Sequence, residues 1–151
     1  MDDILVQDRR DTLVLRLKNV RKTYENCLAG VEPDVANRGS EWSIADLLRH
    51  VDADGLYQNM TMRALKDESP VFESYDAIAR QQQLFERTIA NIDEALRVAT
   101  TATVGELART GTRQGRTYAV IDSLELWVAH FEEHLSQLQN EIRPREGLPG
   151  V

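Results

Sequence analysis

The sequence has only one cysteine, Cys27, and three histidines in 151 residues. A single cysteine cannot form a disulfide within the chain, which agrees with a reducing compartment. No apolar run approaches the roughly 20 residues that cross a bilayer, and residues 1–3 are acidic or neutral where a signal peptide is basic. From these absences we expect a cytoplasmic protein with no membrane partner.

Positive charge is scarce too, since 18 Lys and Arg stand against 25 Asp and Glu and the net charge is −7. A field of this sign repels nucleic acid unless a local basic patch overcomes it. The best such patch is Arg109, Arg113 and Arg116, and the glycines between them are typical of a solvated loop. We therefore expect no nucleic-acid partner, although one of these arginines can still bind an anionic small substrate.

Apolar residues recur at helical spacing along most of the chain, which is 42% hydrophobic and of a length suited to one domain. The spacing predicts helices over residues 3–28, 43–66, 75–99 and 117–142. A brief extended turn at 100–103 and a long Arg- and Gly-containing loop at 105–116 precede the last helix, and no strand pattern is convincing. We predict an all-α four-helix bundle over residues 1–143, with a flexible tail over 144–151.

The second predicted helix has a clear start at Ser43, whose side chain can cap it, with Asp46 at the third helical position. We expect this helix to continue through Gly55, which lowers helix propensity by about 1 kcal/mol relative to Ala. His50 falls at the edge of its apolar stripe, and Asp54 lies one turn later on the same side. In the third helix the spacing turns Leu84 or Phe85, Ile89, Ile92 and Leu96 inward.

All three histidines are candidate metal ligands. His130 and His134 lie four residues apart on the last predicted helix, so their side chains share one face, and His50 comes from another helix. Neutral imidazole is a common ligand for zinc, nickel, copper and iron. Three histidines plus water form an open site, whereas a structural zinc site usually has a fourth protein ligand. The alternative is that each histidine only packs beside an apolar stripe.

The stretch from His130 to His134 also matches the H-x-x-E-H pattern of inverted zinc peptidases. Those enzymes take a further acidic ligand well downstream, but the residues after the last helix have the composition of a tail. Glu133 is expected to project away from the core side of the histidine pair, so we do not assign it as a peptidase base. Trp42 and Trp127 are expected to serve in packing, and Cys27 is expected in the core.

Two blocks resemble a known family. Trp42-Ser43-Ile44-Ala45-Asp46-Leu47-Leu48-Arg49-His50, followed by His130-x-x-x-His134-Leu135-x-Gln137-Leu138, looks like the DinB/YfiT-like superfamily of metal-binding four-helix bundles. The resemblance covers nearly the whole chain, including the helix order. It implies that His50, His130 and His134 coordinate one divalent metal ion, zinc or nickel, with water completing the shell. It also implies a homodimer, since relatives often pair.

The same resemblance implies an activity. Relatives include thiol transferases that use bacillithiol or mycothiol and mycothiol-dependent isomerases. The implied chemistry is activation of a low-molecular-weight thiol, or of a water, for attack on a small electrophile. Asp54 and Tyr57 are candidates to assist beside the metal, and no catalytic residue is assigned. The alternative left open is a non-catalytic metal-binding bundle that acts as a stress-response or interaction module.

Overall fold

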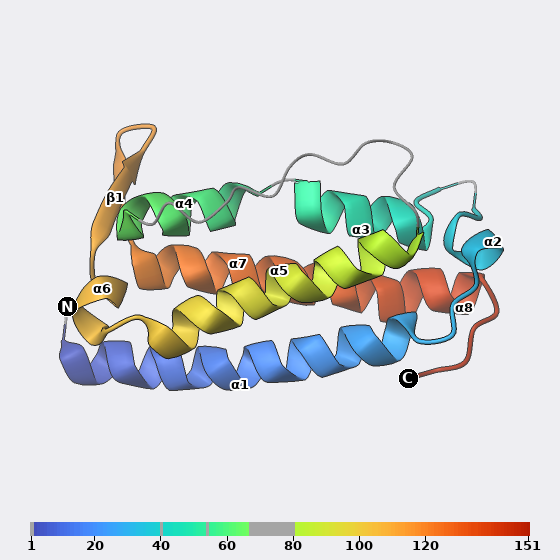
Figure 1. Ribbon diagram of the computed structural model, residues 1–151, viewed down its shortest axis with the longest axis horizontal. Coiled ribbons are helices and arrows are strands. Elements are labelled where there is room, and N and C mark those ends of the chain that lie inside the picture. The colour runs from blue at the N-terminus through green and yellow to red at the C-terminus, as the bar shows by residue number, and fades with distance from the viewer. Residues whose placement is uncertain (1, 40, 54, 67–80) are drawn as a thin grey trace.

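The computed structural model describes residues 2–39, 41–53, 55–66 and 81–151. Figure 1 shows the long helices side by side, with a β-hairpin at one end of the molecule and two short helices at the other. In chain order the elements are α1 (Asp3–Leu28), α2 (Pro33–Ala36), α3 (Ile44–Ala53), α4 (Leu56–Leu65), α5 (Gln81–Thr101), α6 (Val104–Leu107), β1 (Thr110–Arg113), β2 (Arg116–Ala119), α7 (Val120–Gln137), the π-helical turn η1 (Leu138–Ile142) and α8 (Arg143–Arg145).

The fold is mainly helical, with about four long helices packed together, as the apolar spacing predicts. Helix α1 packs against α5 and α7, while α3 and α4 lie end to end, with α3 against α5 and α4 against α7. Within the described residues, no helix combines the length and apolar character needed to cross a bilayer. The largest fully buried side chains include Leu13, Leu17, Tyr24, Leu48, Leu84, Leu124 and Phe131.

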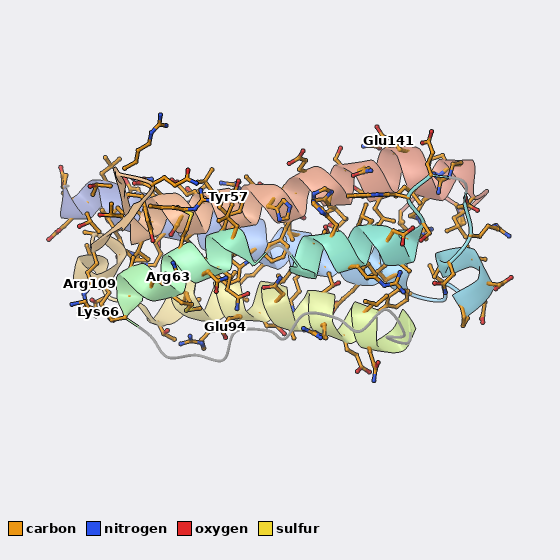
Figure 2. The ribbon with its side chains drawn as sticks, turned by 90° about the horizontal axis from the view of Figure 1, so that it is seen from above. Tyr57, Arg63, Lys66, Glu94, Arg109 and Glu141 are labelled. Carbon is orange, nitrogen blue, oxygen red and sulfur yellow. The ribbon has the colours of Figure 1, made fainter. Side chains whose placement is uncertain are left out.

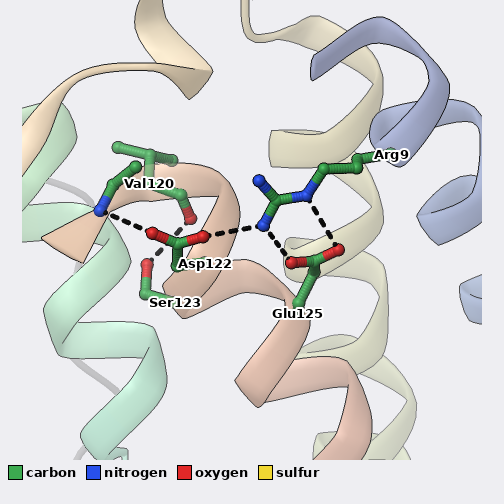
Figure 3. Close-up of polar contacts among 6 residues, drawn as sticks. Arg9, Val120, Asp122, Ser123 and Glu125 are labelled. Carbon is green, nitrogen blue, oxygen red and sulfur yellow. Dashed lines mark hydrogen bonds and ion pairs between the residues drawn. The ribbon is translucent and has the colours of Figure 1, made fainter. Parts of the chain in front are cut away.

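Polar contacts fix α7 against α1. In the core, the Tyr24 hydroxyl donates a hydrogen bond to the Phe131 carbonyl oxygen at 2.9 Å, and burial raises the pKa of Tyr24, so the phenol remains a donor. Near the start of α7, Arg9 lies between Glu125 and Asp122 (Figure 3), with its Nη2 atom 2.7 Å from Asp122 Oδ1. Hydrogen bonding to Glu125, and then to Asp122, raises the pKa of Arg9. These contacts set the register of the helix that carries two of the histidines.

The predicted helix over residues 43–66 is two helices. Its start is confirmed, because Ser43 Oγ accepts from Asp46 N at 3.1 Å and Asp46 Oδ2 accepts from Ser43 N at 3.2 Å. The continuous helix is wrong, because α3 ends at Ala53 and α4 begins at Leu56. Gly55 has φ +42° in the left-handed region, which glycine enters without the clash of a Cβ. The break leaves His50 in the last turn of α3 and Tyr57 in the first turn of α4.

The predicted loop at 105–116 contains most of the short helix α6 and most of a two-stranded antiparallel hairpin. Thr110 pairs with Ala119 and Arg113 with Arg116, across a turn whose central residues, Gln114 and Gly115, both have positive φ. Such a turn matches the twist of a hairpin. The last helix therefore starts at Val120 and not at residue 117. The hairpin is tied to α4, because the Tyr118 hydroxyl donates to the Met60 carbonyl oxygen at 2.7 Å.

The inward face of the third predicted helix is confirmed in part. Its first residues, 75–80, lie outside the described part of the chain, and it continues to Thr101, where an extended turn was expected. Leu84 and Ile92 are fully buried, as expected, whereas Phe85, Ile89 and Leu96 are only partly buried. The buried stripe of the helix also includes Thr88, Asn91, Ala95, Val98 and Ala99. Two of these residues are polar and two are alanines, which is why apolar spacing traced only part of the stripe.

The C-terminal segment makes several contacts. Arg143 is buried and donates one hydrogen bond to the Cys27 carbonyl oxygen at 2.6 Å and another to the Pro149 carbonyl oxygen at 2.8 Å. Gln139 donates to the Val151 carbonyl oxygen at 3.1 Å. The flexibility of residues 144–151 stays a prediction, and these bonds identify what would have to open for the tail to move.

Replacing Gly55 by Ala is expected to reduce the free energy of unfolding by about 1–2 kcal/mol, since a Cβ is unfavourable in the left-handed region. Urea denaturation of the full chain measures the change. The control is Gly105→Ala in α6, where an added Cβ meets nothing closer than 3.8 Å and the φ angle is not positive. If Gly55→Ala stabilises the protein, as helix propensity alone would have it, the break between α3 and α4 is wrong.

Candidate metal centre

Two helices bring the three histidines together. His50 comes from α3, and His130 and His134 come from successive turns of α7, which packs against α3. One ring nitrogen from each histidine lies within 4.8 Å of the others, and the Nε2 atoms of His130 and His134 are 3.1 Å apart. His134 is buried, and the other two are half-buried. The three candidate ligands chosen from the sequence therefore form one cluster that could hold a metal ion.

The rings meet edge to face. The His134 ring centroid lies 4.7 Å from that of His50 and 4.7 Å from that of His130, with interplanar angles of 74° and 88°. Three stacked rings would direct their nitrogens in parallel, whereas tilted rings can direct them to a common point. The arrangement is thus compatible with a shared ion, although edge-to-face contact is also the usual geometry of ring packing.

Gln137 orients His134. Its Oε1 atom lies 3.1 Å from His134 Nδ1, so with the amide oxygen facing the ring, Nδ1 carries the hydrogen. This tautomer leaves the lone pair of His134 Nε2 free to bind a cation. Metal-ligating histidines characteristically donate their other ring N–H to such an acceptor. Gln137 is also the glutamine of the second sequence block, and its contact gives that position a physical role.

The donor set fits a divalent ion. Two nitrogens at about 2.0–2.1 Å from a tetrahedral zinc lie about 3.4 Å apart, close to the 3.1 Å between His130 and His134. The widest separation within the cluster, up to 4.8 Å, requires a small closing movement of one ring. The cluster includes no thiolate: Cys27 is fully buried in α1, and burial raises the pKa of its thiol.

A cavity of about 280 Å³ adjoins the cluster. Its walls come from both sides of the α3–α4 break and from α5 and α7, so the Gly55 break contributes directly to its shape. Its volume is just below the roughly 300–1,000 Å³ of pockets for drug-sized ligands, which indicates a small ligand. Besides the three histidines, it is lined by Val51, Gly55, Leu56, Tyr57, Gln58, Asn91, Trp127 and Glu133.

Aromatic side chains surround the histidines. The Trp42 ring centroid is 4.9 Å from that of His50 and 6.1 Å from that of His134, and 41% of Trp42 is exposed. Trp42 therefore covers the cluster from outside and does not lie in the core. Tyr57 projects between α4 and α7 (Figure 2), with its ring centroid 5.9 Å from that of His130.

Three residues discussed from the sequence have different outcomes here, and a fourth cavity residue, Asn91, was not expected. Tyr57 reaches the cavity, as expected of a residue beside the metal, whereas Asp54 lies outside the described residues. Glu133 is exposed, yet it lines the same cavity, which its helical phase alone did not indicate. Asn91 was missed because it lies in the part of the α5 stripe that the apolar pattern did not trace. The signal that could have found Asn91 is its spacing of seven from Leu84 and from Val98, both buried.

Comparisons of the chain with protein-family models, with curated proteins and with solved structures found no match. What can be said of this site therefore comes from its own geometry and from the residues of the two sequence blocks.

Gln137→Leu is expected to weaken zinc binding about tenfold, because it removes the acceptor that holds the His134 ring. Competition with a chromophoric chelator measures the affinity. The matched control is Gln139→Leu, two residues along, whose side chain bonds the tail and not the cluster. Equal affinity in the wild type and both variants would mean that packing alone orients His134.

Proposed function

We propose that the protein is a metal-dependent enzyme of the DinB/YfiT-like type. In this proposal His50, His130 and His134 hold one zinc or nickel ion and leave a coordination position open to a small ligand. The observation that carries it is the convergence of three imidazoles from two helices beside a cavity of about 280 Å³. Three protein nitrogens with an open position are typical of catalytic rather than structural zinc sites.

A divalent ion bound at this site lowers the pKa of a thiol or a water in the open position, which makes a nucleophile available at neutral pH. The chain's own residues supply the positioning. Gln137 fixes the direction of the His134 lone pair, and Trp42 shields two of the three rings from bulk water on one side. Tyr57 places a phenol at the cavity wall, where it can donate a hydrogen bond to a bound electrophile. The thiol-transfer assignment itself rests on the family resemblance.

The proposed substrate is a small molecule. A cavity of about 280 Å³ suits a small molecule, and a net charge of −7 disfavours nucleic acid. A homodimer and a cytoplasmic location belong to the same proposal. The homodimer follows from the resemblance, and the location follows from the single cysteine and the absence of a long apolar run.

Metal content tests the ligand set. The protein purified without chelator, or titrated with zinc, nickel or cobalt, is expected to hold about one ion per chain, and His130→Ala is expected to lose most of it. Elemental analysis gives the stoichiometry, and circular dichroism checks that the variant keeps its helices. Glu141→Ala is the control, since Glu141 is an exposed residue on η1. Failure of the wild type to take up any of the three metals would refute the proposal.

Activity is tested separately. The metal-loaded protein, given 2-mercaptoethanol or cysteamine and a thiol-reactive dye such as monochlorobimane, is expected to form the conjugate faster than a variant with all three histidines replaced by Ala. Fluorescence of the conjugate measures the rate. Metal binding with equal rates in the two proteins would leave the non-catalytic binding module as the better description.

A further inference from the structure

Asn91 is a buried polar residue whose side-chain oxygen has no hydrogen-bond partner in the described part of the chain. It is 2% exposed, and its Oδ1 atom is buried without a hydrogen-bond partner among the described residues. One turn earlier on α5, the buried Thr88 is satisfied, because its hydroxyl donates to the Leu84 carbonyl oxygen at 2.9 Å. An unpaired buried acceptor is unfavourable by about 1–3 kcal/mol. An apolar side chain at position 91 would avoid this cost, yet the sequence has an asparagine there, whose Oδ1 lacks a hydrogen-bond partner among the described residues.

The residue lies at the wall of the candidate site. Asn91 lines the cavity beside the three histidines, and among the described residues it is the one that α5 contributes. The remaining wall combines apolar residues, Val51, Leu56 and Trp127, with polar ones, Tyr57, Gln58 and Glu133. A ligand held at the metal's open position would therefore lie beside the Asn91 amide, whose oxygen has no hydrogen-bond partner among the described residues. Polar groups at fixed places in a cavity wall orient a small ligand.

We infer that Asn91 determines ligand specificity: its Oδ1 accepts a hydrogen bond from an O–H or N–H group of the small molecule that binds at the open metal position. This inference rests on the proposed metal site and adds the class of ligand to it. The ligand carries a hydrogen-bond donor near its metal-binding atom, and simple alkyl analogues are disfavoured. A site built to bond a polar group rejects an analogue that lacks it, because the acceptor is then left unpaired.

A pair of thiol probes of similar size tests the inference without measuring turnover. The full chain is loaded with cobalt, and 2-mercaptoethanol or 1-propanethiol is titrated while the thiolate-to-cobalt absorption is recorded. The wild type is expected to prefer 2-mercaptoethanol. Asn91→Leu is expected to reduce that preference about fivefold, with cobalt binding unchanged and the free energy of unfolding equal or higher, because the unpaired group is gone.

The controls separate recognition from structure. Thr88→Val also removes a buried polar group from α5 and is expected to keep the wild-type preference. Asn91→Asp keeps the shape and the acceptor, and it is expected to shift the preference further toward cysteamine, whose ammonium group meets the added charge. If Asn91→Leu does not fold, the cysteamine affinity of Asn91→Asp tests whether residue 91 contacts the ligand.

The outcomes are distinct. If Asn91→Leu binds cobalt and keeps the wild-type ratio between the two thiols, or if Asn91→Asp leaves the affinity for cysteamine unchanged, Asn91 does not contact the ligand and the inference is wrong. If the wild type takes up no cobalt, it is the metal site itself that fails.

Discussion

The contact between α3 and α7 is the constraint on which the site depends, because it brings His50 beside a histidine pair from a distant part of the chain. Both helices are fixed along their axes by polar contacts. The reciprocal bonds of Ser43 and Asp46 set the start of α3, about two turns before His50. The bond from Tyr24 to Phe131 holds α7 at the level of the pair. The cluster is thus positioned by ordinary capping and core packing.

One buried polar pair in the core is satisfied, whereas a buried polar atom at the cavity wall is not. Between α4 and α7, the hydroxyls of Thr61 and Ser123 lie 2.8 Å apart and share a hydrogen bond. At the cavity wall, Asn91 Oδ1 has no such partner among the described residues, and the helix is interrupted at Gly55. Departures from local stability rules that gather at one place are expected of a functional site. Two such departures, at Asn91 and Gly55, lie at the cavity beside the three histidines.

Much of the helical fold and the histidine cluster could be predicted from the sequence, because apolar spacing gives helical phase and phase gives the shared face of His130 and His134. The break at Gly55 could not be predicted from helix propensity. A glycine lowers that propensity by only about 1 kcal/mol, which is small beside the free energy of packing. The hairpin was missed because each strand has only four residues. Asn91 was missed because a polar residue interrupts the pattern that would have revealed its burial.

The central claim is that three imidazoles from two helices bind one ion and leave a position open. X-ray absorption spectroscopy of the zinc-loaded full chain measures the ligands directly. We predict scattering from three imidazole rings and at least one further light atom at about 2.0–2.1 Å. A sulfur neighbour at about 2.3 Å, or two imidazoles or fewer, would contradict the account.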